Sequence, residues 1–131
     1  MEESEEKFLI DSYAWVEYLA GSKIGVRAKT YIESGSAYTP TIVIAEISSK
    51  FEREKLDFSR ALRFMETKTS IVDLDRDTAA RVGNIDTENR TRVKGWGLAD
   101  SIVLSTSRSM KAKVVTGDEH FRNLREAIMI K

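Results

Sequence analysis

The sequence predicts an α/β protein, a three-layer α/β/α domain around a parallel sheet of four to five strands. Short apolar runs that suit buried strands alternate along the chain with longer segments of helical spacing. Strands that alternate with helices pair in parallel through right-handed crossovers. The 131 residues, 41% of them hydrophobic and 32% charged, fit one globular domain.

The first half of the chain predicts two strands, each followed by a pair of helices. We expect strands at 7–11 and 37–39, and helices at 12–20, 24–33, 41–54 and 57–66. Ser12 is available to cap the first helix, Gly21 interrupts the helical spacing, and Gly35 stops the second helix. Pro40 suits the first turn of the third helix, because its missing N–H costs nothing there. The fourth helix carries apolar residues such as Phe58 on one face.

The second half predicts three further strands and two helices. We expect strands at 70–74 and 113–116, a short strand at 127–130, and helices at 77–89 and 98–110. Ala80, Val82 and Ile85 are among the apolar positions of the first of these helices, and the second is rich in small residues. Residues 90–97 are expected to join the two helices as a basic loop.

Composition excludes several classes of site. The chain has no cysteine, so disulfides and thiolate metal sites are excluded, and a bound metal must take oxygen ligands or the single histidine. No apolar run approaches the length of a membrane span. The first residues are acidic, the opposite of a cationic signal-peptide start, so we expect a cytoplasmic protein without a membrane partner.

The charges are balanced but unevenly distributed. The 21 basic and 21 acidic residues give a formal net charge of zero, which argues against a polyanionic partner. Four of the acids, however, lie in an acidic N-terminal extension over residues 1–6, outside the expected core. Without this extension basic residues are in excess, and a metal that offsets clustered acids would make the surface more basic still.

A short basic stretch and a tryptophan are candidates for contact with nucleic acid. Arg90, Arg92 and Lys94 are able to grip phosphates, although a solvated basic loop is the more frequent explanation of such a run. Trp96, between two glycines, is able to stack on a base. Its alternative interpretation is a hydrophobic plug between loop and helix.

Four carboxylates lie beside or within the most apolar segments: Asp11, Glu46, Asp100 and Asp118. An acid in such a place is costly to desolvate unless something compensates its charge. In open parallel sheets, ligands bind beyond the carboxyl ends of the strands, where Asp11 and Asp118 fall. Asp100 begins a helix, whose dipole favours an anion. The pattern therefore predicts one negative cluster that holds a divalent cation, with Glu46 as its fourth member.

Each acid taken alone has a simpler interpretation. Asp11 suits a helix cap, Asp100 an acid in a first turn, and Asp118 an ordinary turn residue. Glu46 has apolar neighbours on both sides in sequence, yet one face of its helix can be solvated. The joint pattern, more than any member, supports the cluster.

The chemistry that suits such a cluster is phosphodiester hydrolysis, in which a nucleophile approaches a centre surrounded by negative oxygens. Divalent cations assist by lowering the pKa of a bound water and offsetting charge. Mg²⁺ and Mn²⁺ are the expected cofactors, because both prefer hard oxygen ligands. Ser12 and Thr116 are candidate hydroxyl supports, with a helix cap and a strand end as their simpler roles. His120 is interpreted as a surface residue outside the metal site.

Four segments in series carry a resemblance to a known family: residues 8–15, 38–46, 97–103 and 114–121. Together they resemble the PIN-domain family, in particular the VapC-type ribonuclease toxins of prokaryotic toxin–antitoxin pairs. The resemblance implies a single PIN-like domain over residues 1–131 with Mg²⁺- or Mn²⁺-dependent endoribonuclease activity. The acidic extension is not part of the family pattern.

The resemblance also implies residue roles and partners. By position, Asp11, Glu46, Asp100 and Asp118 match the family's acidic quartet, and Thr116 matches the hydroxyl that precedes the last acid by two positions. It implies RNA as the substrate, a homodimer, and a small antitoxin that fills the active-site groove.

Alternative functions remain open from sequence. A PIN-domain nuclease of RNA processing has the same quartet, and a binding module with a degenerate site is a further possibility, against which the complete quartet argues. A phospho-acceptor receiver domain also has alternating strands and helices with acids at strand ends. In that case Asp73 or Asp75 is the acceptor and Thr116 the switch hydroxyl, but the first strand lacks a second adjacent acid.

Overall fold

Five parallel strands form one sheet in the computed structural model, which describes residues 6–131. The order across the sheet is β3-β2-β1-β4-β5, and β1 and β4 lie at its centre. The predicted α/β architecture with a four- to five-stranded parallel sheet is therefore confirmed. Most of the acidic extension, residues 1–5, lies outside the described residues. The strands are β1 Lys7–Ile10, β2 Ala37–Pro40, β3 Ser70–Val72, β4 Ala112–Thr116 and β5 Ala127–Met129.

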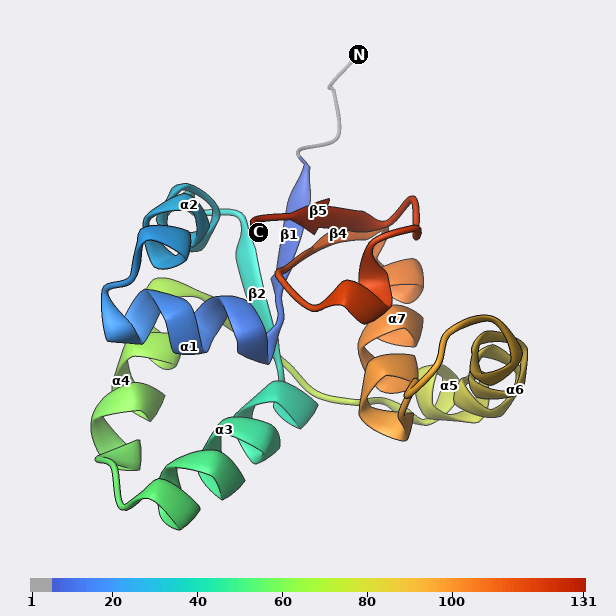
Figure 1. Cartoon of the computed structure of the whole chain (residues 1–131), viewed down its shortest axis with the longest axis horizontal. Helices are drawn as coiled ribbons and strands as arrows, with labels where there is room; N and C mark the ends of the chain where they lie inside the picture. Colours follow the sequence, from blue (N-terminus) through green and yellow to red (C-terminus); the bar gives the residue numbers. More distant parts are fainter. Residues whose placement is uncertain (1–5) are drawn as a thin grey trace.

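Helices cover both faces of the sheet, which gives the three layers (Figure 1). The first four helices lie on one side, and α7 lies on the other with α6 and the short α5 against it (Figure 1). The helices are α1 Ser12–Ala20, α2 Lys23–Ile32, α3 Thr41–Glu54, α4 Phe58–Lys68, α5 Arg76–Ala80, α6 Val82–Arg92 and α7 Leu98–Met110, with the 3-10 helix η1 at Glu119–Phe121.

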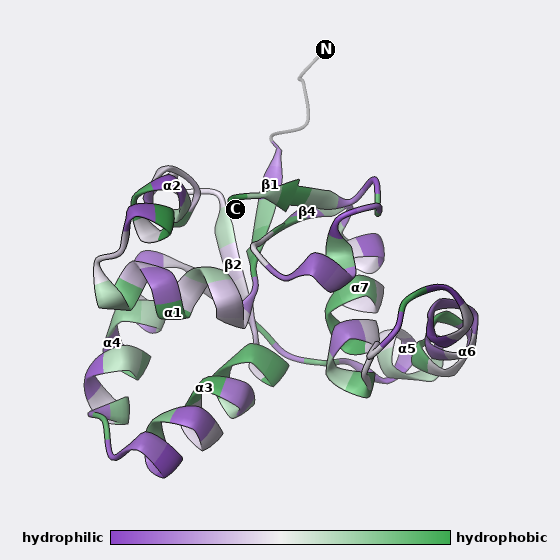
Figure 2. Cartoon of the chain, in the orientation of Figure 1, coloured by the Kyte–Doolittle hydropathy of each residue, from purple (hydrophilic) through white to green (hydrophobic). Residues whose placement is uncertain are grey.

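The core lies around the two central strands. Leu9 of β1 pairs in register with Val114 of β4, and both side chains are fully buried. The hydropathy colouring follows this pattern, with mostly hydrophobic residues on the inner strands and hydrophilic residues on the outward helix faces (Figure 2). Trp15 of α1 is also fully buried, and its indole N–H donates to the Thr39 hydroxyl over 2.9 Å. This bond joins one helical layer to β2 and leaves no buried indole donor unpaired.

The observed ends of some helices and strands differ slightly from the predicted ends. Asp11, not Ser12, caps α1, because its carboxylate accepts the Ser12 backbone N–H over 2.8 Å. Pro40 is the last residue of β2 and precedes the first turn of α3. The helix predicted over 24–33 ends one residue earlier, at Ile32, and Gly35 adopts a φ of 86° in the turn that follows.

The segment predicted as one helix over 77–89 forms two. The Asp75 carboxylate accepts the Thr78 backbone N–H and starts α5, which ends at Ala80. Arg81 then separates α5 from α6. The second helix continues to Arg92, so residues 90–92 of the expected basic loop are helical. Within residues 6–131, none of the helices combines the length and the apolar character that crossing a membrane requires.

Helices α1 and α2 pack closely at Gly25, so we expect a side chain at this position to lower stability. A Cβ atom at Gly25 would lie 2.2 Å from the backbone oxygen of Glu17. We expect Gly25→Ala to lower the free energy of unfolding by about 1–3 kcal/mol through overpacking. Gly83→Ala is the matched control: it has open space around it in α6 and should gain up to about 1 kcal/mol. Urea unfolding of both variants checks this, and equal stability of Gly25→Ala and the unmodified chain would contradict the packing.

Candidate functional site

The four predicted acids lie near the carboxyl ends of the central strands and influence one another's charge. Helices α1, α3 and α7 begin at this edge of the sheet (Figure 1). Asp11 directly follows β1, and Asp118 follows β4 by two residues. Asp100 lies in the first turn of α7. Glu46 lies in the second turn of α3, which follows β2. The segments that follow the three neighbouring strands β2, β1 and β4 therefore lie at the same edge of the sheet.

Asp11 is the most deeply buried member, with 5% of its surface exposed. One carboxylate oxygen accepts the Ser12 backbone N–H, and the other accepts the Thr116 hydroxyl over 2.8 Å. Burial raises the pKa of Asp11 from 3.8 to about 6, in spite of these hydrogen bonds. The charges of Asp118 and Asp100 raise it further. The anionic form of Asp11 is therefore held in an unfavourable environment.

Glu46, on α3, is affected by the charges of the other three acids as well. Its carboxyl is partly buried, and desolvation followed by the charge of Asp11 raises its pKa from 4.5 to about 7. Asp100 and Asp118 add to this increase, whereas a hydrogen bond from the Ser12 side chain opposes it. The four acids therefore form one electrostatic cluster.

Thr116 links the first and last acids of the cluster. Its hydroxyl donates to the Asp11 carboxylate, and the hydroxyl oxygen accepts the backbone N–H of Asp118 over 2.9 Å. Gly117 lies between them, and a Cβ atom there would come within 2.3 Å of the Tyr13 ring. The close approach of Tyr13 thus requires glycine at this position and lets the β4–η1 turn fold against α1.

His120 joins the cluster, although from sequence it was expected to lie outside. Its Nδ1 lies 3.0 Å from Oδ2 of Asp100 and 3.6 Å from Oδ1 of Asp118. The Asp118 carboxylate accepts the backbone N–H of His120, which turns the chain back toward α7. The spacing of acid and histidine two residues apart in a turn was the available signal, but the contact with Asp100 joins distant parts of the chain.

The donor atoms of this cluster fit a divalent cation. One ligand atom each from Asp100, Asp118 and His120 lies within 4.8 Å of the other two. The raised pKa values of Asp11 and Glu46 indicate negative charge that the surrounding residues leave uncompensated. A hard or borderline cation with oxygen ligands would offset it.

The predicted phosphate-binding residues do not join the cluster. Arg90 and Arg92 lie in the last turn of α6, where they pair with Asp86 and Glu88 one turn earlier. Such pairs at spacing i,i+4 stabilise a helix, which accounts for the extension of α6 through the expected loop. Lys94 is exposed in the connection to α7.

Trp96 is an interior residue, with 2% of its surface exposed. Its indole N–H donates to the Ser101 hydroxyl over 2.7 Å, and its ring packs against Phe121. A base has no open ring face to stack on in this position. The hydrophobic plug, the alternative interpretation, describes the observed tryptophan.

A groove of about 710 Å³ leads away from the acids between α1 and α3. Lys50 and Arg53 line it, one and two turns after Glu46 on α3. Tyr13, Ser49, Ser12 and the acid Glu17 are also part of its polar lining. The sequence pattern did not single out the two basic residues, because in sequence they stand among acids and do not form a run.

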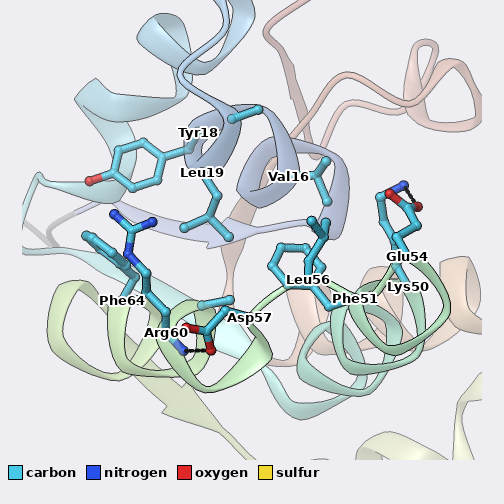
Figure 3. A pocket seen from close by; sticks show the side chains of 12 residues that line it. Val16, Tyr18, Leu19, Lys50, Phe51, Glu54, Leu56, Asp57, Arg60 and Phe64 are labelled. Carbon is cyan, nitrogen blue, oxygen red and sulfur yellow. Dashed lines mark hydrogen bonds and ion pairs between the residues drawn. The ribbon is translucent and has the colours of Figure 1, made fainter.

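A second, more apolar groove of about 630 Å³ separates α1 from α3 and α4 (Figure 3). Leu19, Phe51, Leu56 and Phe64 point into it, and Lys50 pairs with Glu54 at one end (Figure 3). The two grooves share Val16 and Lys50 in their linings. They are therefore neighbouring parts of one surface depression.

The alternative phospho-acceptor residues lie elsewhere. Asp73 and Asp75 follow β3, the edge strand of the sheet, which β2 separates from the central β1. Asp75 caps α5, and Asp73 is exposed. Neither is among the charges that raise the pKa of Asp11 or Glu46.

Comparisons with known proteins agree with this architecture. The family model of the PIN domain matches residues 8–127. No curated protein matches the chain in sequence. A chain of a toxin–antitoxin complex from Klebsiella pneumoniae has a TM-score of 0.75 at 16% identity, over 95% of this chain and 98% of that one.

Two further solved structures are similar over most of their length. A chain of DNA-bound VapBC from Salmonella typhimurium has a TM-score of 0.74 at 18% identity, over 97% of this chain and 100% of that one. VapC20 of Mycobacterium tuberculosis, a sarcin–ricin loop cleaving toxin, has a TM-score of 0.71 at 15% identity, over 88% and 92%. At these identities the likeness is one of fold.

The raised pKa of Asp11 generates a prediction about stability. Because its folded pKa of about 6 exceeds the unfolded value of 3.8, the folded state binds more protons between these values. The stability from this group is complete below about pH 4 and is lost as the pH rises through about 6. In metal-free protein at about pH 7.5, Asp11→Asn should therefore raise the free energy of unfolding by about 2–3 kcal/mol.

Urea unfolding of both proteins across this pH range checks the prediction. The difference between Asp11→Asn and the unmodified chain should be small at about pH 4 and largest above pH 6. If the variant is less stable than the unmodified chain at about pH 7.5, this would contradict the inference that burial destabilises the Asp11 carboxylate anion.

Proposed function

The chain belongs to the PIN domain family, and from this premise we propose that it is a divalent-metal-dependent endoribonuclease, the toxin of a toxin–antitoxin pair. One observation carries the proposal: Asp11, Glu46, Asp100 and Asp118 lie close enough to interact, and burial together with the charges of the neighbouring acids raises the pKa of Asp11 and Glu46. Proteins retain such a cluster at a cost in stability where it binds a cation.

Asp11, Asp100 and Asp118 are the proposed metal-holding carboxylates, with Glu46 completing the site from α3. The bound Mg²⁺ or Mn²⁺ would supply water activation and charge neutralisation at the phosphodiester. Ser12 and Thr116 fix the Asp11 carboxylate through its two oxygens. This fixed orientation matters, because a site of this kind depends on ligands that are already in place.

The groove beside the acids is the proposed path of the RNA strand. Lys50 and Arg53 line it and offset backbone phosphates, while the Tyr13 ring offers a surface for a base. These residues replace Arg90, Arg92 and Lys94 as the favoured substrate contacts. One of the similar structures is that of a sarcin–ricin loop cleaving toxin, which supports RNA as the substrate class.

A protein antitoxin is the proposed partner, since two similar structures are toxin–antitoxin complexes. The apolar groove next to the acidic one suits its docking. A segment that fills the apolar groove would reach Val16 and Lys50 (Figure 3), which also line the groove that contains Glu46. A homodimer remains a prediction from the family. A nuclease of RNA processing remains the alternative function.

Asp100→Asn tests the nuclease directly. We expect it to reduce cleavage of a defined RNA panel at least about a hundredfold, as loss of one fixed electrostatic group does. The chain should keep its circular dichroism spectrum. Asp73→Asn is the matched control, because Asp73 is exposed beside the edge strand and should leave cleavage unchanged.

Two results would remove the nuclease proposal. One is full activity of Asp100→Asn, and the other is activity of the unmodified chain that EDTA does not diminish. Stable labelling of Asp73 by acetyl phosphate would instead support the receiver-like alternative.

Expression in cells separates a toxin from a processing enzyme. The unmodified chain and Asp73→Asn should arrest growth, whereas Asp100→Asn should not. Co-expression of the neighbouring gene's product should relieve the arrest. Leu56→Asp should remain toxic but escape this relief, because Leu56 is half exposed in the apolar groove and outside the acidic one. Growth unaffected by the active nuclease would favour RNA processing.

A further inference from the structure

The imidazole of His120 lies in the acidic cluster, beside two of its carboxylates. It lies in η1, and 31% of its side chain is exposed. The Asp118 carboxylate holds its backbone N–H over 2.9 Å, and this turn directs the imidazole toward α7. Its Nδ1 faces two carboxylate oxygens, one of Asp100 and one of Asp118.

Two of the distances among these three groups lie in the range expected for ligands of one ion. Ligands about 2.1 Å from an octahedral ion lie about 3 Å apart when adjacent and about 4 Å apart when opposite. The Nδ1 to Oδ2 distance to Asp100 is 3.0 Å, and that to Oδ1 of Asp118 is 3.6 Å. One atom from each of the three residues lies within 4.8 Å of the others. The three side chains are thus close enough to share a cation without rearrangement of the backbone.

The surroundings hold the imidazole in this place. Gly95 has a φ of 82°, and a Cβ atom there would lie 3.2 Å from Nε2 of His120. The buried Trp96 ring packs against the imidazole, with 6.4 Å between ring centroids. Trp96 also bonds Ser101, the neighbour of Asp100. The Gly95–Trp96 pair therefore positions the imidazole and the start of α7 together, which gives the tryptophan an indirect role at the site.

We propose that His120 is a metal ligand, donating Nδ1 to the ion that Asp100 and Asp118 hold. This inference rests on the proposed metal site. A nitrogen ligand gives the site a preference for first-row transition ions over Mg²⁺, because Mg²⁺ favours oxygen and imidazole binds the transition ions better. The site then differs from one built of carboxylates alone in the ion that it selects.

Metal binding by the full chain tests the proposal without measuring cleavage. We expect calorimetric titration to give tighter binding of Mn²⁺ than of Mg²⁺, and His120→Gln to weaken Mn²⁺ binding at least about tenfold. Binding of Mg²⁺ should change much less. Electron spin-echo modulation of the Mn²⁺-loaded chain should contain a nitrogen coupling that His120→Gln removes. Glu119→Gln, the exposed neighbour paired with Arg122, is the matched control and should keep both the affinity and the coupling.

Bound Mn²⁺ without nitrogen coupling, or equal Mn²⁺ affinity in His120→Gln, would overturn the proposal. Circular dichroism of each variant confirms that it is folded before it is titrated. The outcome is separable from that of the nuclease proposal. RNA cleavage without nitrogen coupling would remove only the role of His120, whereas nitrogen coupling without RNA cleavage would uphold it and remove only the nuclease.

Discussion

Burial of the Asp11 carboxylate at the meeting point of three helices is the constraint on which the site depends. Desolvation and the charges of Asp118 and Asp100 both disfavour its anion, and the two hydrogen bonds that it accepts only partly compensate. Burial also raises the pKa of Glu46 on α3, and the charge of Asp11 raises it further. A fold selected for stability alone would place an apolar residue at such a position, so the cost indicates a function that needs charge there.

The parallel sheet is what makes this concentration of charge possible. Because β1 and β4 are adjacent and run the same way, their carboxyl ends deliver Asp11 and Asp118 to one edge. The Thr116 hydroxyl forms hydrogen bonds with the Asp11 carboxylate and with the backbone N–H of Asp118. The first turn of α7 adds Asp100. Rigid elements thus carry most of the cluster. Only Asp118 and His120 depend on a turn, and that turn is held by its own hydrogen bonds and by the Trp96 plug.

The sequence predicted features that local pattern determines and missed those that depend on distant contacts. Strands and long helices follow from apolar periodicity, and acids at strand ends follow from topology once the alternation is recognised. The role of His120 depends on a contact with Asp100, twenty residues away, that no short pattern records. Trp96 between two glycines fits either a plug or a stacking platform, and only tertiary packing separates these. The extension of α6 through Arg92, by contrast, was available from the sequence, since Asp86 and Glu88 each precede an arginine by four residues.

The central claim is that these side chains form one cation site at the carboxyl edge of the sheet. Anomalous diffraction from crystals of the full chain soaked in Mn²⁺ tests it most directly, because the signal locates the ion independently of activity. We expect a peak within bonding distance of carboxylate oxygens of the proposed metal-holding residues Asp11, Asp100 and Asp118 and of Nδ1 of His120. Ordered Mn²⁺ elsewhere on the surface, with this cluster empty, would contradict it.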